Sequence, residues 1–190
     1  MKDISLHIMD IIENSIRAGA RNVWIELSLI VMRNKLKIII RDDGRGMDET
    51  KLNRIDDPFY TTKEHRSKKV GLGIPLFKQN AEQCNGNFEI KSKLGEGTTL
   101  EAVFQYDHLD RMPLGNLKDT FLTAIVGHPE TDFHLNLTRE YLDGKKLGFK
   151  FSTQPIKFEL GDIPLVYPDV IQYLDDALTE GIKEINLEEH

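Results

Sequence analysis

Two polar side chains stand four residues apart in an otherwise apolar stretch near the start of the chain. The spacing of Asp10 and Asn14 places both side chains on one face of a helix, one turn apart, where they can share a ligand or a metal ion. Apolar residues recur around them at helical spacing: Leu6, Ile8, Ile11, Ile12 and Ile16. For this segment alone, the alternative interpretation is a core helix with a polar rim, so the later motifs must decide between the two.

A second candidate site is a carboxylate followed by two glycines. Residues 42–47 read Asp-Asp-Gly-Arg-Gly-Met. Two glycines around one residue let the backbone approach a ligand closely, and a carboxylate at a strand end can accept a hydrogen bond from an exocyclic amine. An Asp-Asp-Gly sequence is also an ordinary turn, so this stretch does not identify a ligand by itself.

A third candidate site is a glycine-rich helix start. Residues 70–76 read Val-Gly-Leu-Gly-Ile-Pro-Leu and open a stretch with apolar residues at helical spacing. Amide N–H groups at a helix N-terminus are unpaired and carry a partial positive charge, which suits them to hold phosphate. Pro75 fits the first turn, where its missing donor costs nothing. The stretch lacks the third glycine of a Rossmann fingerprint and the Gly-Lys-Ser/Thr of a Walker loop.

These candidate residues belong to an alternation of helices and strands that would position them. Apolar periodicity predicts helices, and strict alternation predicts strands, with a short polar turn over 33–35 that indicates a hairpin. The expected elements are a helix over 6–20, strands over 21–29 and 36–40, a helix opened by residues 70–76, and strands over 88–92 and 100–104. The carboxylate at 42 would therefore lie at a strand end.

Composition limits the class of protein. The chain has 190 residues, of which 39% are hydrophobic, and this is enough to bury a core. Its longest apolar run is far shorter than a transmembrane helix, and acidic residues interrupt the region where a signal peptide needs an apolar stretch. The single cysteine, Cys84, cannot form an internal disulfide. Together these features predict a cytoplasmic protein without a membrane segment.

Charge is distributed unevenly along the chain. Residues 1–106 carry a net charge of +2, whereas residues 107–190 carry −8. A general nucleic-acid surface needs a concentrated basic stripe. A nucleic-acid partner is therefore not expected, and the C-terminal part has the composition of an acidic appendage.

Taken in order, the motifs resemble the ATP-binding domain of the superfamily that contains histidine kinases, gyrase B, Hsp90 and the mismatch-repair protein MutL. The resemblance covers residues 3–106 and rests on an N box (10–14), a G1 box (42–47), an F box (58–63) and two later glycine boxes (71–73 and 95–99). Residues 13–20 are closest to MutL, and the F box and everything after it are closest to histidine kinases. The resemblance implies a two-layer α/β sandwich of the Bergerat type, with ATP and Mg²⁺ held between the sheet, the helices and a flexible lid.

The resemblance also implies roles for single residues. Asn14 would coordinate Mg²⁺, Asp42 would accept a hydrogen bond from the adenine amino group, and Asp10 would be the catalytic residue. Further nucleotide contacts would come from the glycines, the adenine pocket and the lid, at Gly44, Gly46, Met47, Thr62, Lys63, Lys69, Gly71, Leu72, Gly73 and Thr99. Which of the lid cations reaches the terminal phosphate stays open between Lys63, Arg66, Lys68 and Lys69.

This sequence departs from the family pattern at two positions. Members that hydrolyse ATP usually carry a glutamate that positions water, whereas this chain has Asp10, which is one methylene shorter. A kinase-like member tolerates this change better than a hydrolase. Where kinases usually read Gly-Thr-Gly-Leu-Gly, the first glycine is replaced by Lys69, so the lid is expected to close differently.

Residues 107–190 lie outside this resemblance and are expected to form a small α+β extension. Periodicity predicts a helix over 117–126, a hairpin of strands over 133–137 and 147–152, and a helix over 169–181. No metal-ligand spacing or nucleophile constellation occurs here. The extension is therefore expected to dock on the ATP-binding domain or on a partner without contributing to the nucleotide pocket. The whole chain resembles stand-alone ATP-binding proteins encoded beside bacterial iron-only hydrogenase subunits.

The function that follows is an ATP- and Mg²⁺-binding regulatory protein of the histidine-kinase type, a kinase or slow ATPase that acts on a separate protein. His108, His128, His134 and His190 lack the helical context of a kinase phosphoacceptor. His7 is expected in the core or at the rim of its helix, and His65 in the lid, so the acceptor is expected on the partner. The alternative is a nucleotide-gated binding module with negligible catalysis. A MutL-like role on DNA ranks third, because the acidic tail opposes it.

Overall fold

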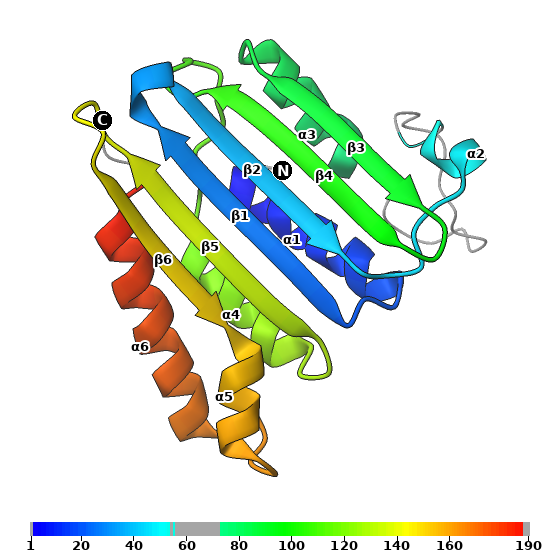
Figure 1. Cartoon of the computed structure of the whole chain (residues 1–190), viewed down its shortest axis with the longest axis vertical. Helices are drawn as coiled ribbons and strands as arrows, with labels where there is room; N and C mark the ends of the chain where they lie inside the picture. Colours follow the sequence, from blue (N-terminus) through cyan, green and yellow to red (C-terminus); the bar gives the residue numbers. More distant parts are fainter. Residues whose placement is uncertain (1, 54, 56–72, 188–190) are drawn as a thin grey trace.

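In the part of the chain that the structure describes, six strands form one mixed sheet, and helices lie against one of its faces (Figure 1). The computed structural model describes residues 2–53, 55 and 73–187. The strand order is β3-β4-β2-β1-β5-β6. In chain order the elements are α1 (Ile4–Arg17), β1 (Asn22–Ile30), the 3-10 helix η1 (Val31–Arg33), β2 (Lys35–Asp42), α2 (Glu49–Leu52), α3 (Gly73–Gln83), β3 (Asn87–Lys93), β4 (Gly97–Gln105), α4 (Leu117–Gly127), β5 (Asp132–Glu140), β6 (Lys146–Ser152), α5 (Thr153–Leu160) and α6 (Pro168–Ile185).

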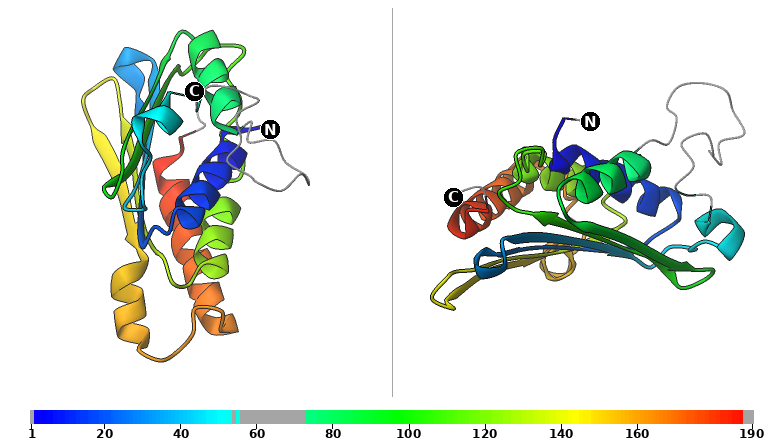
Figure 2. Two further views of the ribbon diagram at one scale, coloured as in Figure 1. Left: turned by 90° about the vertical axis from the view of Figure 1, so that its right-hand side faces the viewer. Right: turned by 90° about the horizontal axis from the view of Figure 1, so that it is seen from above.

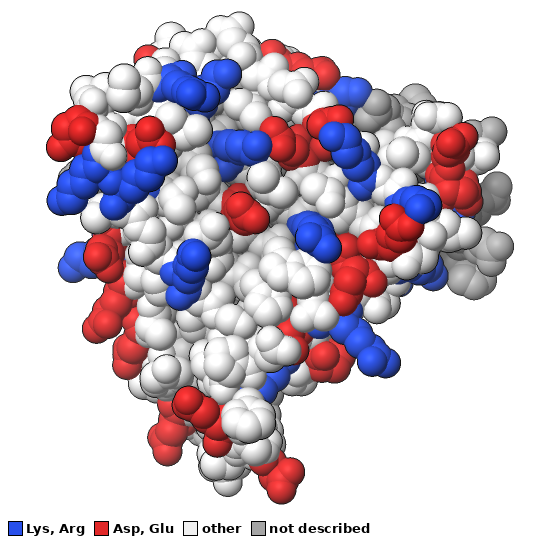
Figure 3. All heavy atoms as spheres, viewed as in Figure 1, with Lys and Arg blue, Asp and Glu red and all other residues white. Residues whose placement is uncertain are grey.

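The two layers follow from the alternation of the strands. In β1 every second residue from Val23 to Leu29 is buried, and β2 and β4 repeat the pattern. The buried side chains face α3, α1, α4 and α6, which follow one another across the helical layer (Figure 2). The opposite face is open and carries charges of both signs (Figure 3). The predicted fold class, a two-layer α/β sandwich, is confirmed.

Helix α1 lies in the middle of the helical layer, between α3 and α4. Its N-cap is Asp3, whose Oδ1 accepts a hydrogen bond from the backbone N–H of Leu6 at 2.9 Å. Its apolar stripe, formed by Ile4, Ile8, Ile11 and Ile12, is buried against the sheet. The exposed face of the same helix is therefore left for polar side chains.

The segment after residue 106 continues the same sheet. Strand β5 pairs in parallel with β1, and β6 pairs antiparallel with β5, so β1 has a neighbour on both sides. Helices α4 and α6 of this segment pack against each other, and α4 also contacts α1. The division of the chain after residue 106 stays a prediction. None of the described helices is long and apolar enough to cross a membrane.

Candidate functional site

Asp42 lies at the end of β2 with its carboxylate held from two sides. The residue is only 6% exposed. Its Oδ2 accepts a hydrogen bond from Ser15 Oγ of α1 at 2.8 Å, and its Oδ1 accepts one from the backbone N–H of Gly44 at 2.9 Å. A carboxylate oxygen has two lone pairs. Each oxygen of Asp42 can therefore accept one further hydrogen bond from a ligand.

We call residues 42–47 the Asp42 loop. Its backbone is hydrogen-bonded to the turn after α1 and to the turn between β3 and β4. The backbone N–H of Arg45 donates to Ala18 O at 2.9 Å, and Arg45 O accepts from the N–H of Gly95 at 2.8 Å. Gly46 has a φ of +64°, and a Cβ there would lie 2.0 Å from Lys93 O. A side chain at Gly46 is excluded by backbone conformation and by space. Gly46 therefore lets the backbone of the loop approach the β3–β4 turn closely.

The register of β4 against β2 decides which threonine side chain lies on the face of Asp42. Asp42 pairs with Thr98, and Arg41 pairs with Thr99. Directly opposed residues of an antiparallel pair share a face of the sheet, so Thr98 lies on the face of Asp42 and Thr99 on the open face. Thr98 Oγ1 is 2.9 Å from Ser92 Oγ, which also accepts from the N–H of Met47. The adenine contact of Thr99 stays a prediction, and the register places the side chain of Thr98, rather than that of Thr99, on the face of Asp42.

The exposed face of α1 carries a row of polar side chains. Asn14 Nδ2 donates to Asp10 Oδ2 at 3.3 Å, and Arg17 Nη2 donates to Asn14 Oδ1 at 2.8 Å. The predicted pairing of Asp10 and Asn14 on one helix face is present. An amide oxygen beside a carboxylate fits Mg²⁺, which proteins usually hold through one or two oxygens plus substrate phosphates. Asn14 Oδ1 keeps a second lone pair for the metal, but the positive charge of Arg17 beside it opposes Mg²⁺.

His7 joins α1 to the first residue of α3. Its side chain is 1% exposed, is stacked on Phe77 with ring centroids 4.9 Å apart, and has Nδ1 3.1 Å from Gly73 O. A carbonyl only accepts, so Nδ1 carries the hydrogen. Burial lowers the pKa of the His7 imidazole. Gly73, the described end of the glycine-rich box, is therefore held by a neutral ring.

Several predicted residues lie outside the described part of the chain. They are Thr62, Lys63, Lys69, Gly71 and Leu72. Within the described residues, the structure gathers Asp42, Gly44, Gly46 and Met47 in one loop, and places Asp10 and Asn14 on the neighbouring helix. No group of three or more His, Cys, Asp or Glu side chains with metal-site geometry occurs in residues 2–53, 55 and 73–187.

Sequence reasoning missed two residues that contact the site. Ser15 holds Asp42, and its signal was available: it lies in line with Ile8, Ile11 and Ile12, and a polar residue on the apolar face of a helix needs a partner. Thr98 was missed because the strand was predicted to begin at residue 100, whereas β4 begins at Gly97. Because β4 includes Thr98, its pairing with Asp42 of β2 shows on which face of the sheet the side chain of Thr98 lies.

Residues 2–108 match the protein family described as histidine kinase-, DNA gyrase B-, and HSP90-like ATPase. Sporulation kinase C of Bacillus subtilis is 33% identical over 95 residues, which cover 50% of this chain and 22% of that protein. The sensor histidine kinase YcbM of the same organism is 31% identical over 94 residues, which cover 48% of this chain and 30% of that protein. The matched region thus spans less than a third of either kinase.

Two solved structures are also similar. The N-terminal domain of a DNA repair protein has a TM-score of 0.47 and 16% sequence identity, with 78% of this chain and 52% of that chain covered. The Aquifex aeolicus MutL ATPase domain complexed with ADP has a TM-score of 0.43 and 13% identity, with 72% and 60% covered.

Proposed function

Because the chain belongs to the family of histidine kinase-, DNA gyrase B- and HSP90-like ATPases, we propose that it binds ATP and ADP through the Asp42 loop. The observation that carries this proposal is the buried carboxylate of Asp42, whose two oxygens each accept one protein hydrogen bond and have a second lone pair for another. The amino group of adenine is a suitable donor. Guanine has a carbonyl oxygen at that position, which the carboxylate would repel, so ATP is favoured over GTP.

The neighbouring residues have matching roles in this proposal. Gly44 and Gly46 shape the loop, Met47 and Thr98 flank Asp42 toward the β3–β4 hairpin, and Gly73 begins the helix that follows the phosphate-binding glycines. Asn14 is proposed as the protein ligand to Mg²⁺, which would neutralise phosphate charge. Thr62, Lys63, Lys69, Gly71 and Leu72 are proposed phosphate contacts on sequence grounds alone.

The proposed chemistry is kinase-like. The terminal phosphoryl group would pass to a side chain of a separate protein or to water, ADP would leave, and the proton released by the acceptor would go to Asp10. Asp10 lies on the exposed face of α1 beside Asn14, next to the proposed phosphate position. The protein would then act as a histidine-kinase-like regulator or slow ATPase. The relation to proteins encoded beside iron-only hydrogenase subunits stays a prediction.

A protein partner is supported by the surface of the α5–α6 region. Residues 158–173 contain three acidic residues and no basic one. Large apolar side chains are at least half exposed there, at Phe158, Ile163, Val166, Tyr167 and Tyr173. Exposed apolar side chains that gather in one region are typical of protein interaction surfaces.

The alternative function is a nucleotide-gated binding module with negligible catalysis. It is favoured by the row on α1, where the cation of Arg17 donates to the amide oxygen of Asn14 and opposes a metal ion there, and the short side chain of Asp10 accepts a hydrogen bond from Asn14. Incubation with γ-labelled ATP and native lysate separates the two functions. Label on another protein supports the kinase, free phosphate supports the ATPase, and retained ATP supports the module.

Calorimetric titration with Mg·ADP tests the binding proposal itself. We expect Asp42→Asn to lose about 1 to 3 kcal/mol of binding free energy, because the substituted amide no longer offers two acceptor oxygens to the buried amino group. Asp143→Asn is the matched control, since Asp143 accepts from the N–H of Lys145 in the distant β5–β6 turn. Equal affinity of the wild type and Asp42→Asn, or equal affinity for ATP and GTP, would contradict the proposal.

A further inference from the structure

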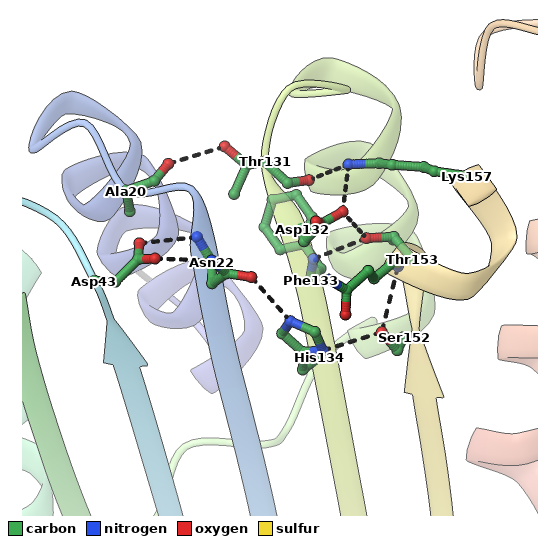
Figure 4. A network of polar contacts seen from close by, with 11 residues as sticks. Ala20, Asn22, Asp43, Thr131, Asp132, Phe133, His134, Ser152, Thr153 and Lys157 are labelled. Atoms are coloured by element: carbon green, nitrogen blue, oxygen red, sulfur yellow. Dashed lines mark hydrogen bonds and ion pairs between the residues drawn. The ribbon is translucent and has the colours of Figure 1, made fainter. Parts of the chain in front are cut away.

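The residue after Asp42 anchors the Asp42 loop to the start of β1. Asp43 Oδ1 accepts hydrogen bonds from the backbone N–H groups of Arg21 at 2.8 Å and Asn22 at 2.9 Å, and Oδ2 accepts one from Asn22 Nδ2 at 2.8 Å (Figure 4). Burial alone would raise the pKa of Asp43, but the hydrogen bonds from Asn22 and Arg21 outweigh it and hold the pKa below its ordinary value. Three donors on one carboxylate fix the loop at its first turn.

The side chain of Asn22 is in turn oriented by a histidine from the C-terminal segment. Because Asn22 Nδ2 donates to Asp43, its Oδ1 faces His134, whose Nε2 is 3.3 Å away. An amide oxygen only accepts, so Nε2 carries the ring hydrogen, and Nδ1 accepts from Ser152 Oγ at 3.0 Å. The ring also stacks on Trp24 with centroids 5.4 Å apart. Burial lowers the pKa of His134, which favours the neutral ring that these contacts require.

The same end of the sheet is held by other residues of the C-terminal segment. Thr131 Oγ1 donates to Ala20 O, and Lys157 Nζ of α5 donates to Thr131 O and to Asp132 Oδ1, both at 2.7 Å. Thr153 Oγ1 donates to the same oxygen of Asp132 at 3.2 Å. As Figure 4 shows, these contacts run from α5 through β5 to the turn between α1 and β1. The Asp42 loop thus rests on a turn that the C-terminal segment holds in place.

We propose that His134 is a positioning residue for nucleotide binding, acting through Asn22 and Asp43 on the Asp42 loop. This inference rests on the proposed function, because it assigns that site a determinant outside the family-matched region. The direction of an acceptor decides the strength of its hydrogen bond. A loop that is free to tilt at Asp43 would turn the carboxylate of Asp42 away from the amine, so the C-terminal segment sets the affinity.

Two amide substitutions distinguish the hydrogen bond that His134 donates to Asn22 from the packing of its ring. In His134→Gln the side-chain nitrogen reaches the position of Nε2 and can still donate to Asn22. In His134→Asn, one methylene shorter, the amide reaches only the position of Nδ1 and leaves Asn22 Oδ1 without this donor. The matched control is Thr138→Val, which removes the hydrogen bond from Thr138 Oγ1 to Ser28 Oγ, also between β5 and β1 but distant along the strands from the Asp42 loop.

The first measurement is amide hydrogen exchange of residues 43–47 in the full chain without nucleotide. We expect exchange to rise about fivefold or more in His134→Asn and to stay at the wild-type level in His134→Gln and Thr138→Val. The second is the affinity for Mg·ADP, which should fall about fivefold to tenfold in His134→Asn. The Gln variant should keep the wild-type affinity for Mg·ADP. If His134 acted only through the packing of its ring, both variants would lose affinity, because both lack the ring.

Unchanged exchange and affinity in His134→Asn would overturn the inference, as would equal losses in Thr138→Val. If the wild type does not bind ADP, the proposed function fails, and the exchange measurement still decides whether His134 positions the loop. If His134→Asn does not fold, Asn22→Ser replaces it, because serine keeps the backbone donor to Asp43 and removes both side-chain contacts of Asn22. Wild-type exchange in that variant would equally overturn the inference.

Discussion

Asp10, Asn14 and Arg17 form one hydrogen-bonded row along the exposed face of α1. In the proposed site, Asp10 is a proton acceptor whose side chain is too short to reach its target well. We expect Asp10→Glu to raise ATP hydrolysis about tenfold or more, because a longer carboxylate brings the general base closer to the attacking oxygen. Asn14→Ala should weaken ADP binding in the presence of Mg²⁺ and change it little in EDTA. Phosphate release and calorimetry measure the two effects.

Fast hydrolysis by the wild type that survives Asp10→Ala would show that this face of α1 is not catalytic. Loss of ADP affinity in Asn14→Ala that is equal with and without Mg²⁺ would remove the metal role of Asn14. Arg17→Ala is a useful companion variant, since it frees Asn14 Oδ1 without changing the proposed ligand.

The buried imidazole of His7 gives the fold a pH dependence with a definite sign. Burial holds its pKa in the folded state below the value of 6.5 that it has when unfolded. Above pH 6.5 both states are neutral and the contribution to stability is complete. As the pH falls below 6.5, the unfolded chain binds a proton that the folded chain resists, so folding stability decreases. His7→Gln, which does not titrate, should therefore lose less stability than the wild type between pH 7.5 and 5.5.

Urea unfolding at the two pH values measures this difference. His134 also has a pKa lowered by burial, but it is present in both proteins, so its contribution cancels in the comparison. An equal loss of stability in the wild type and His7→Gln would show that His7 is not protected from protonation in the folded state.

At the scale of the elements, periodicity predicted most helices and strands near their observed positions. The helix predicted over 6–20 is α1 (Ile4–Arg17), and the strands predicted over 21–29 and 36–40 overlap β1 and β2, with ends that differ by one or two residues. Helix α5 was not predicted, because it has only eight residues and its largest apolar side chain, Phe158, is 89% exposed. A short helix that turns an aromatic ring to solvent has little amphipathic signal.

The neighbours of each strand could be predicted only where the chain joins them by a short turn. The hairpins β1–β2 and β5–β6 follow from such turns. The parallel pairing of β1 with β5 joins residues 110 positions apart, such as Asn22 and Asp132, and alternation alone does not select that neighbour. The network around His134 depends on this pairing, which is why the sequence did not reveal it.

Two helical glycines have opposite surroundings, and their substitution separates packing from helix propensity. A Cβ on Gly181 of α6 would lie 2.1 Å from the ring of Phe149, whereas a Cβ on Gly127 of α4 would have no neighbour within 4 Å. Alanine favours the helix over glycine by up to ~1 kcal/mol, but overpacking costs ~1 to 3 kcal/mol. We expect Gly181→Ala to destabilise the protein and Gly127→Ala to be neutral or stabilising.

Thermal or urea unfolding of both variants measures the effect. Because the two glycines lie in helices of the same segment, a similar change in both would mean that propensity outweighs the contact with Phe149. Destabilisation by Gly181→Ala alone would establish close packing of α6 on β6 as a determinant of stability.

Across the molecule as a whole, the segment after residue 106 supplies hydrogen-bond acceptors and core residues to the segment before it. The backbone N–H groups of Ile4 and Ser5 donate to Pro113 O and Leu114 O, which satisfies donors at the start of α1. Tyr106 Oη donates to Leu187 O at 2.8 Å, and the buried residues of both segments form one core. The two segments therefore share one core, and the expectation that residues 107–190 dock on the ATP-binding domain or on a partner without contributing to the nucleotide pocket stays a prediction.

A chain that ends after Tyr106 would lose the strand and helices that cover β1 and α1. Removing β5 turns β1 into an edge strand of nine residues, and removing α4 uncovers apolar side chains of α1 and β1. A long apolar edge favours association between chains, and the lost neighbours take away part of a small core. We expect the truncated chain to elute as aggregates in size-exclusion chromatography and to unfold without a cooperative transition.

A monomeric truncated chain that unfolds cooperatively and binds Mg·ADP within about tenfold of the full chain, or ~1.4 kcal/mol, would instead establish residues 1–106 as an independent domain. The same result would show that the nucleotide site does not need the contacts from His134, Thr131 and Pro113.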